Sequence, residues 1–275
     1  MKLEDFEIRV IDNKKELVEY FSRIAELFEE SFSRPLDKKL WVWLYINNPM
    51  GEPIVSLAFH DDKLVGHYAV IPMTLTGGSP IEKSYIAITT MISYKYRRIN
   101  LYQTLADSTY EVIKKSQMPT LVFGFPNDNA KAGCRKRLQW LVDDNYCIAK
   151  VKPTEYVNLI KYLIAEQINN KFTIDFSDES VVSWRTSKIS QEWCIDGNLG
   201  VKIGDGYNDL MYCKESIVLE DLTDYESINV LLDKSKVGDL LYEEAFNYRF
   251  GYRLFNCEPI KRPELFVQMC MSDVF

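Results

Sequence analysis

The chain has 275 residues, of which 47% are hydrophobic and 27% charged, a balance typical of a globular protein with one large or two small domains. Its formal net charge of −7 argues against a nucleic-acid-binding protein, because such proteins need a basic surface. We find neither an N-terminal signal core nor an apolar run approaching the ~18 residues of a membrane span. The six cysteines are scattered without a Cys-x-x-Cys pair, and with only two histidines we expect reduced thiols, a cytoplasmic location and no metal site.

The first third of the chain has the pattern of a strand, two helices and a hairpin. Apolar residues repeat at helical spacing after Asn13, and Asp37 is placed to cap a second helix. The dipeptide Asp61-Asp62 lies between two apolar runs, which predicts the turn of a hairpin. In chain order we expect a strand at 6–10, helices at 13–32 and after residue 37, and strands at 54–60 and 64–75.

A strand–helix–strand unit follows. An apolar, β-branched run from Tyr85 to Ile92 predicts a buried strand, and residues 120–125 predict another. Between them, apolar residues from Leu101 onward fall on one face of a helix, which Pro119 ends because proline cannot continue it. Two strands joined through a helix in this way should be parallel.

A basic turn precedes this helix. It runs from Tyr94 to Asn100 and contains Arg97 and Arg98. The first N–H groups of a helix have no internal partner and the helix dipole is positive at that end, so the turn could bind a phosphate. The two guanidinium groups would suit a pyrophosphate. A solvated turn that contacts nothing is the other interpretation, and spacing alone leaves both open.

The second half of the chain has the pattern of a further α/β unit. Asp178 precedes Trp184 by six residues, as Asp37 precedes Trp43, and the same offset of 141 residues separates both pairs. We interpret this half as a degenerate repeat of the first, with a plain α+β extension as the alternative, because two matched positions can arise by chance. The expected elements are helices at 128–140 and 156–168, an antiparallel strand pair within 141–151, strands at 199–203, 210–214 and 217–222, helices at 227–232 and 240–249, and a closing strand at 263–271.

The segment around the basic turn has the character of an Arg/Gln-x-x-Gly-x-Gly/Ala loop. Arg97 stands at its first position, and Asn100 and Tyr102 replace the two glycines, asparagine being the least costly substitute where the backbone visits positive φ. Three more segments accompany it: Trp-x-Tyr-x-x-Asn-Pro at 43–49, Phe-Gly-Phe-Pro-Asn at 123–127 and Leu-Gln-Trp at 138–140. In this order they resemble the GCN5-related N-acetyltransferase (GNAT) superfamily, and within it a branch of bacterial surface-polysaccharide enzymes.

The resemblance covers residues 6–150 and implies a mixed α/β fold: a GNAT domain at 1–153 that binds acyl-CoA, and a degenerate GNAT-like domain at 154–275 that helps to form the acceptor pocket. It further implies an N-acyltransferase that moves acetyl or a short hydroxyacyl group, such as hydroxybutanoyl, from acyl-CoA to the amine of a nucleotide-linked amino-deoxysugar by direct attack. Two alternatives stay open. One is a peptidoglycan-directed aminoacyl transferase that uses aminoacyl-tRNA, which the acidic net charge disfavours. The other is a non-catalytic acyl-CoA-binding module. The oligomeric state, including a homodimer, is left open.

The resemblance also assigns binding residues. Backbone groups of the first strand would face the thioester, the basic turn would hold the pyrophosphate, and Asn127 would bind the pantetheine arm unless it only caps the next helix. The aromatic residues would stack on the acceptor, with an ordinary core role as the alternative. For acyl-CoA the residues are Thr90, Met91, Ile92, Arg97, Arg98, Ile99, Asn100, Leu101, Tyr102 and Asn127, and for the acceptor they are Trp43, Tyr45, Tyr68 and Phe125.

Two residues are candidates for proton transfer. His67 lies on a strand expected beside the strand–helix–strand unit, and an ordinary pKa of ~6.5 suits a general base. The alternative is a half-buried histidine satisfied by a neighbour. Cys134 stands about where many GNAT members have a tyrosine acid, and a thiol with a pKa of ~8.5 could protonate the leaving thiolate. A lone helical cysteine is more often a small core residue.

Overall fold

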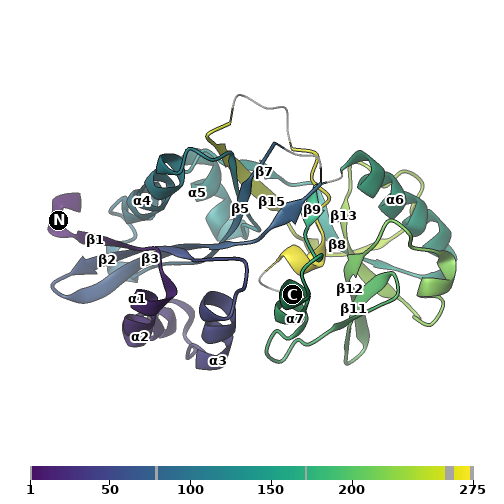
Figure 1. Cartoon of the computed structure of the whole chain (residues 1–275), viewed down its shortest axis with the longest axis horizontal. Coiled ribbons are helices and arrows are strands. Elements are labelled where there is room, and N and C mark those ends of the chain that lie inside the picture. Colours follow the sequence, from purple (N-terminus) through teal and green to yellow (C-terminus); the bar gives the residue numbers. More distant parts are fainter. Residues whose placement is uncertain (1, 78–79, 171, 258–262, 273–275) are drawn as a thin grey trace.

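The structure is a computed structural model that describes residues 2–77, 80–170, 172–257 and 263–272. Figure 1 shows two lobes side by side, each built on one β-sheet, with the N-terminal half on the left and the C-terminal half on the right. Among the described residues, no helix has the length and apolar character that crossing a membrane would require.

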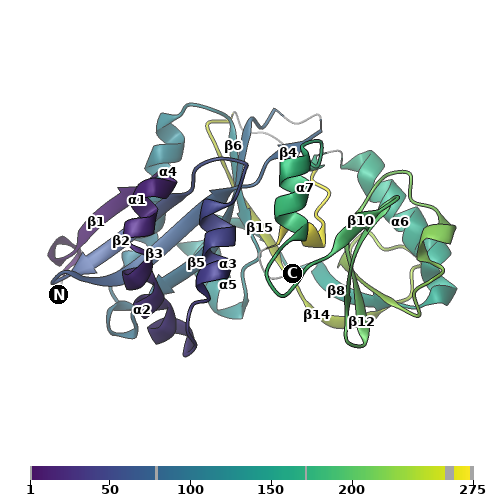
Figure 2. The ribbon, with the colours of Figure 1, turned by 60° about the horizontal axis from the view of Figure 1, so that its bottom comes forward.

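The first sheet has seven strands in the order β1-β2-β3-β5-β6-β15-β7. All neighbours are antiparallel except β5 and β6, which are parallel as the connecting helix predicts. Helices α1, α2 and α3 cover one face, and α4 and α5 cover the other (Figures 1 and 2). The bounds are β1 Glu7–Ile11, α1 Lys14–Glu19, α2 Phe21–Phe32, α3 Lys38–Trp41, β2 Ile54–His60, β3 Lys63–Pro72, β5 Lys83–Ile92, α4 Leu101–Lys115, β6 Thr120–Gly124, α5 Asp128–Lys136, β7 Leu141–Asp143 and β15 Phe250–Phe255.

The second sheet has six strands in the order β10-β11-β12-β13-β8-β14, and only β12 and β13 pair in parallel. Helix α6 covers its outer face, while α7 lies between the two lobes (Figure 2). A short pair, β4 with β9, also links the halves. The bounds are β4 Leu75–Thr76, β8 Tyr146–Val151, α6 Tyr156–Asn169, β9 Thr173–Ile174, α7 Glu179–Thr186, β10 Cys194–Asp196, β11 Leu199–Gly204, β12 Tyr207–Cys213, β13 Ile228–Asp233 and β14 Glu243–Asn247.

The local signals of the first half act as predicted. The Asn13 side chain caps α1 by accepting from the Glu16 N–H group, and Asp37 caps α3 by accepting from Lys39 and Leu40. Asp61 and Asp62 have φ angles of 49° and 60°, as a tight hairpin turn requires. One difference is that the helix expected at 13–32 breaks into α1 and α2; another is that α3 continues into a π-helical turn, Val42–Ile46.

Several expectations for the second half are wrong. The segments 227–232 and 240–249, expected as helices, contain β13 and β14. The strand expected at 217–222 is a short 3₁₀ helix, Leu219–Leu222, and the described residues of 263–271 end in another, Met269–Met271. The expected strand pair within 141–151 does not form, because β7 joins the first sheet and β8 the second.

The chain crosses between the two sheets twice. It leaves the first sheet between β7 and β8, and it returns between β14 and β15, so that β15 from the second half pairs with β6. β8 precedes the expected domain boundary at residue 153 but belongs to the second sheet. β15 follows that boundary but belongs to the first sheet. Each sheet needs strands from both halves, which ties the two lobes together.

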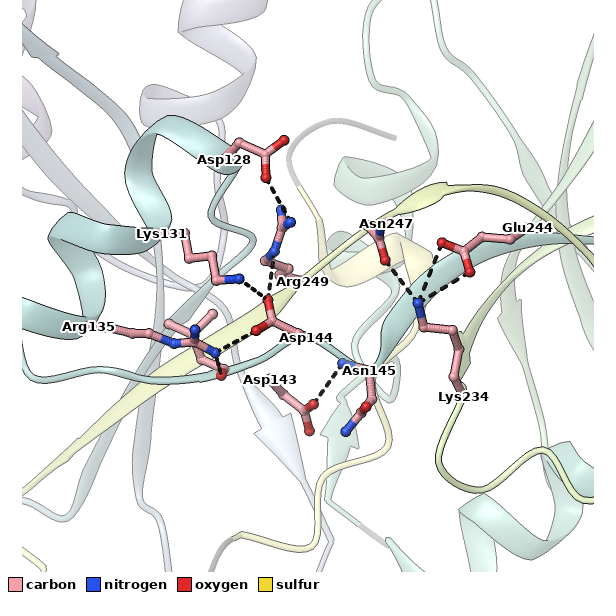
Figure 3. Close-up of polar contacts among 11 residues, drawn as sticks. Asp128, Lys131, Arg135, Asp143, Asp144, Asn145, Lys234, Glu244, Asn247 and Arg249 are labelled. Carbon is pink, nitrogen blue, oxygen red and sulfur yellow. Dashed lines mark hydrogen bonds and ion pairs between the residues drawn. The ribbon is translucent and has the colours of Figure 1, made fainter.

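A cluster of charged residues joins the two crossing points (Figure 3). Asp144, in the first crossing, accepts from Lys131 Nζ and Arg135 Nη2, both at 2.8 Å, and from Arg249 Nε in the second crossing at 2.7 Å. Arg249 also bonds Asp128 at the start of α5 at 2.7 Å. These cations, of which Lys131 has the largest effect, hold the pKa of Asp144 below its usual range.

The two residues of the sequence repeat meet in the core between the lobes. The indole rings of Trp43 and Trp184 stack with centroids 5.2 Å apart and an interplanar angle of 21°. Each indole N–H group donates to the backbone carbonyl of the other tryptophan, at 2.7 and 2.8 Å. Asp178 caps α7 by accepting from Ser180, as Asp37 caps α3. The repeat positions are therefore related by a local two-fold arrangement, which favours the repeat over the plain extension.

Candidate active site

The pairing of the parallel strands β5 and β6 ends well before β5 does, which leaves a gap beside the last residues of β5. They pair from Lys83 opposite Thr120 to Ile86 opposite Phe123, and the pairing goes no further although β5 continues to Ile92. A gap between two parallel strands exposes backbone groups that would otherwise bond across it. Helix α4 begins a few residues after β5, so its N-terminus lies at the same edge of the sheet.

A β-bulge lies in β5 beside this gap. The pairing with β3 runs from His67 opposite Met91 to Ala69 opposite Ile88, so Thr89 and Thr90 together oppose a single β3 residue. Thr89 has φ +47°, a left-handed conformation that is costly for a β-branched residue. Such bulges redirect backbone groups, and this one lies in the stretch that sequence analysis assigned to the thioester.

The N-terminus of α4 has no side-chain cap. The Asn100 amide donates to Gln103 Oε1 at 3.1 Å, and its side chain does not accept from the helix N–H groups. Arg97 donates through Nε to the Ile92 carbonyl at 3.1 Å, and both Arg97 and Arg98 are exposed. Uncapped N–H groups, a positive helix dipole and two exposed guanidinium groups therefore meet, which fits a pyrophosphate.

The neighbouring loop positions differ in their surroundings. Leu101 is buried in the core beneath α4, and the half-buried Ile99 packs against the same core, so a role of either residue toward acyl-CoA stays a prediction. Asn127 is exposed and caps α5 by accepting from the Ala130 N–H group at 3.0 Å. Its capping role is thus present, and a role toward pantetheine stays a prediction.

Tyr102 fills the space between α4 and α5. Its hydroxyl lies 3.3 Å from Cys134 Sγ, and a Cβ atom built on Gly133 would come within 2.8 Å of its ring. Burial raises the pKa of both the Tyr102 phenol and the Cys134 thiol, so each stays protonated near neutral pH. Cys134 is buried, as the core interpretation of a helical cysteine expects.

His67 does not have the surroundings of a general base. Its side chain is fully buried, and Nδ1 lies 2.7 Å from the Thr89 carbonyl oxygen. A carbonyl only accepts, so Nδ1 carries the proton, and Nε2 has no hydrogen-bond partner among the described residues. Burial lowers the pKa of His67 to about 4, so the ring is neutral at pH 7 and closed to solvent.

The aromatic residues expected at the acceptor divide into two groups. Trp43 is buried between the lobes, Tyr45 is buried beside Trp41 and His67, and Tyr68 is buried with its hydroxyl 2.7 Å from that of Tyr110, so all three pack in the core. Phe125, just after β6, is half-buried and stacks on Tyr248 with centroids 4.9 Å apart.

Sequence analysis missed two aromatic residues near Phe125. Tyr248 stacks on it, and Phe246, whose ring lies 6.0 Å from Tyr248, is 48% exposed. Both lie in a segment that was expected to be a helix. Phe246 lies on β14, and Tyr248 lies between β14 and β15. The exchange of strands between the sheets brings this segment toward Phe125, and no local sequence pattern indicates that exchange. The described residues contain no group of three metal-ligating side chains.

The sequence matches no protein-family model and no curated protein. Its fold, however, is similar to several solved structures. A GCN5-related N-acetyltransferase from Kribbella flavida superposes with a TM-score of 0.61 and 11% identity, covering 93% of this chain and 73% of that chain. A GCN5-related N-acetyltransferase from Anabaena variabilis gives 0.55 and 10%, covering 90% and 72%. Eis1 from Mycobacterium abscessus gives 0.57 and 12%, covering 90% and 73%. The chain therefore has the GNAT fold that its motifs predict.

Proposed function

We propose that this protein is an acyl-CoA-dependent N-acyltransferase. The observation that supports it most is a coincidence of three features at one sheet edge. These are the gap between β5 and β6, the bulge at Thr89, and the uncapped N-terminus of α4 with Arg97 and Arg98. A phosphate-binding helix end beside exposed strand backbone suits a long ligand with a pyrophosphate at one end and a carbonyl at the other.

In the proposed reaction the pyrophosphate lies against the first turn of α4 and the thioester enters the gap. The backbone N–H group of Thr90, which points away from β3, then faces the thioester carbonyl oxygen. An uncharged amine attacks the carbonyl carbon, the oxygen takes up negative charge that this N–H group stabilises, and the carbon–sulfur bond breaks to release the CoA thiolate. The attacking nitrogen loses one proton and the thiolate gains one, so the products are an amide and CoA.

The acceptor in this proposal is the amine of a nucleotide-linked amino sugar, as the sequence resemblance suggests. Phe125, Phe246 and Tyr248 form an aromatic surface next to the end of β6, with contributions from both halves of the chain. Aromatic faces stack on sugar and nucleobase rings. This surface takes the place of Trp43 and Tyr45 as the proposed acceptor site, because those two side chains are buried.

A second candidate is an acyl-CoA-binding module without chemistry. Two observations favour it. Tyr102 occupies the space that a glycine would leave open beside α5, and His67, which lies beside the bulge, is sealed in the core. Under this alternative CoA binds at α4 but no thioester is consumed.

A thioester-consumption assay separates the two candidates. Acetyl-CoA and hydroxybutanoyl-CoA are each offered with a panel of nucleotide-linked amino sugars, and free CoA is measured with a thiol reagent. We expect CoA release that depends on one amine and a product heavier by the acyl group. CoA binding without release under any acceptor would support the module, and release that requires an aminoacyl-tRNA in place of acyl-CoA would contradict the proposal.

A further inference from the structure

We propose that His67 is a positioning residue whose Nδ1–H group holds the Thr89 carbonyl, and so keeps the β5 bulge in the shape that presents the Thr90 N–H group to the thioester. The catalytic consequence of this contact rests on the proposed function, whereas the contact itself rests on the geometry of the bulge. In this role His67 holds the backbone in place and does not act as a general base.

The bulge needs something to hold it. A threonine at φ +47° is in a region that β-branched residues rarely adopt, and such a conformation persists only where its surroundings fix it. Where two residues oppose one, the ladder of backbone hydrogen bonds is interrupted. The carbonyl of Thr89 then needs another donor, and the His67 ring supplies one at 2.7 Å from the adjacent strand.

The histidine is poorly explained as a core filler. An aliphatic side chain would fill a fully buried strand position without leaving a polar atom unsatisfied. In His67, by contrast, Nε2 has no hydrogen-bond partner among the described residues, and the only N–H group of the ring donates to the Thr89 carbonyl. The Tyr45 ring meets the imidazole edge-on, with centroids 6.3 Å apart, and fixes its orientation. This arrangement directs one donor at one carbonyl.

The donor also lies in the right place to affect the reaction. His67 is directly opposite Met91 in the β3–β5 register, and Thr90 lies between Met91 and the carbonyl that His67 holds. The Thr90 N–H group belongs to the same peptide unit as the Thr89 carbonyl, so a rotation of this peptide would turn the N–H group proposed to bind the oxyanion. Losing one such donor typically lowers the rate by ~10²–10³-fold, so a partial misalignment should lower kcat by about 10- to 100-fold.

Two substitutions distinguish positioning from base catalysis. The amide nitrogen of asparagine is separated from Cβ by the same number of bonds as Nδ1, so His67→Asn keeps a donor within reach of Thr89 and has no basic ring. His67→Leu removes the donor at similar size. Positioning predicts that kcat falls strongly in His67→Leu and is largely kept in His67→Asn, with the Kd for CoA unchanged in both. A general base predicts an equal loss of ~10²–10⁴-fold in both variants.

The control is Ser56→Ala on β2, which removes a buried hydrogen bond, 2.7 Å long, to Thr109 on α4 and leaves the contact between His67 and Thr89 in place. Its kcat should stay near that of the wild type while its melting temperature falls. If His67→Leu lost no more activity than this control, His67 would be a core residue only. Equal loss in His67→Asn and His67→Leu would also overturn the proposal.

Two further measurements cover other outcomes. If His67→Leu fails to fold, Thr89→Gly in the same chain should restore it, because glycine adopts positive φ without cost; no restoration would refute the strain argument. If the wild type acylates no amine, the proposed function fails, but amide hydrogen exchange still tests the geometry. Exchange at Thr90 should rise in His67→Leu and not in His67→Asn, and unchanged exchange in His67→Leu would overturn the inference.

Discussion

The contact between Trp43 and Trp184 should be a main source of cohesion between the lobes. Replacing Trp184 with leucine removes the ring stack and the indole N–H group, and it leaves the buried carbonyl of Trp43 without its donor. Large aromatic truncations in a core cost ~3–5 kcal/mol, and leucine recovers part of the volume, so we expect about 3 kcal/mol for Trp184→Leu.

The same loss is expected for Trp43→Leu, because the contact is reciprocal: each ring donates to the other residue's carbonyl. The double variant loses the shared stack only once. An aromatic pair contributes ~0.5–1.5 kcal/mol beyond its buried area, so the double-mutant cycle should give a coupling of about 1 kcal/mol. Urea unfolding followed by tryptophan fluorescence and by far-UV circular dichroism measures the four stabilities.

An additive cycle would refute this reasoning. If the two single losses summed to the double loss within ~0.5 kcal/mol, the stack would contribute no more than two independent core residues. A large loss for Trp43→Leu with almost none for Trp184→Leu would equally contradict the reciprocal arrangement.

Two more predictions concern stability. Lys131 and two arginines hold the pKa of Asp144 below its usual range, so its carboxylate stabilises the fold above the unfolded pKa of ~4, and this stabilisation is lost as the pH falls through the lower folded pKa. Because the Asp144 side chain is 42% exposed, Asp144→Asn should cost only ~1 kcal/mol at pH 7, and progressively less as the pH falls below ~4, in urea unfolding; a pH-independent difference would contradict this. Gly66→Ala should cost ~1–3 kcal/mol in the same assay, because its Cβ would lie 2.8 Å from the buried side chain of Leu105, and a neutral result would show that this leucine can move.

The first half of the fold was predictable because its signals are local. Asn13 and Asp37 cap the helices they were expected to cap, and the hairpin turns at Asp61-Asp62. The parallel pairing of β5 with β6 follows from the helix between them. Each of these features depends on residues close in sequence, so a pattern is sufficient to find it.

The errors in the second half come from contacts that are distant in sequence. Glu243–Asn247 is rich in helix-forming residues, but it becomes β14 because its backbone pairs with β8, about a hundred residues earlier in the chain. Ile228–Asp233 is a short, mostly apolar segment, which suits a buried strand and a buried helix equally, and pairing with β8 decides the outcome. The exchange of β8 and β15 between the sheets leaves no local signal.

The site was predictable in its backbone and less so in its side chains. The basic turn and the strand beside it lie where the motifs placed them, at the N-terminus of α4. Whether a side chain points to solvent or to the core depends on what packs over it. For this reason His67 and Trp43 were expected at a ligand and are buried. Tyr248, which stacks on Phe125, and Phe246, which contacts Tyr248, were not expected there.

Calorimetric titration of CoA tests the central assignment, the acyl-CoA site at the N-terminus of α4, most directly. The double variant Arg97→Ala/Arg98→Ala removes two charges at that end, and Lys114→Ala/Lys115→Ala removes two at the other end of the same helix as the matched control. Hydrogen bonds to charged groups contribute ~1.5–3 kcal/mol, so we expect CoA binding to weaken by more than ~10-fold in the arginine variant and to stay near the wild-type value in the lysine variant. An unchanged Kd in the arginine variant, or an equal loss in both, would contradict the assignment.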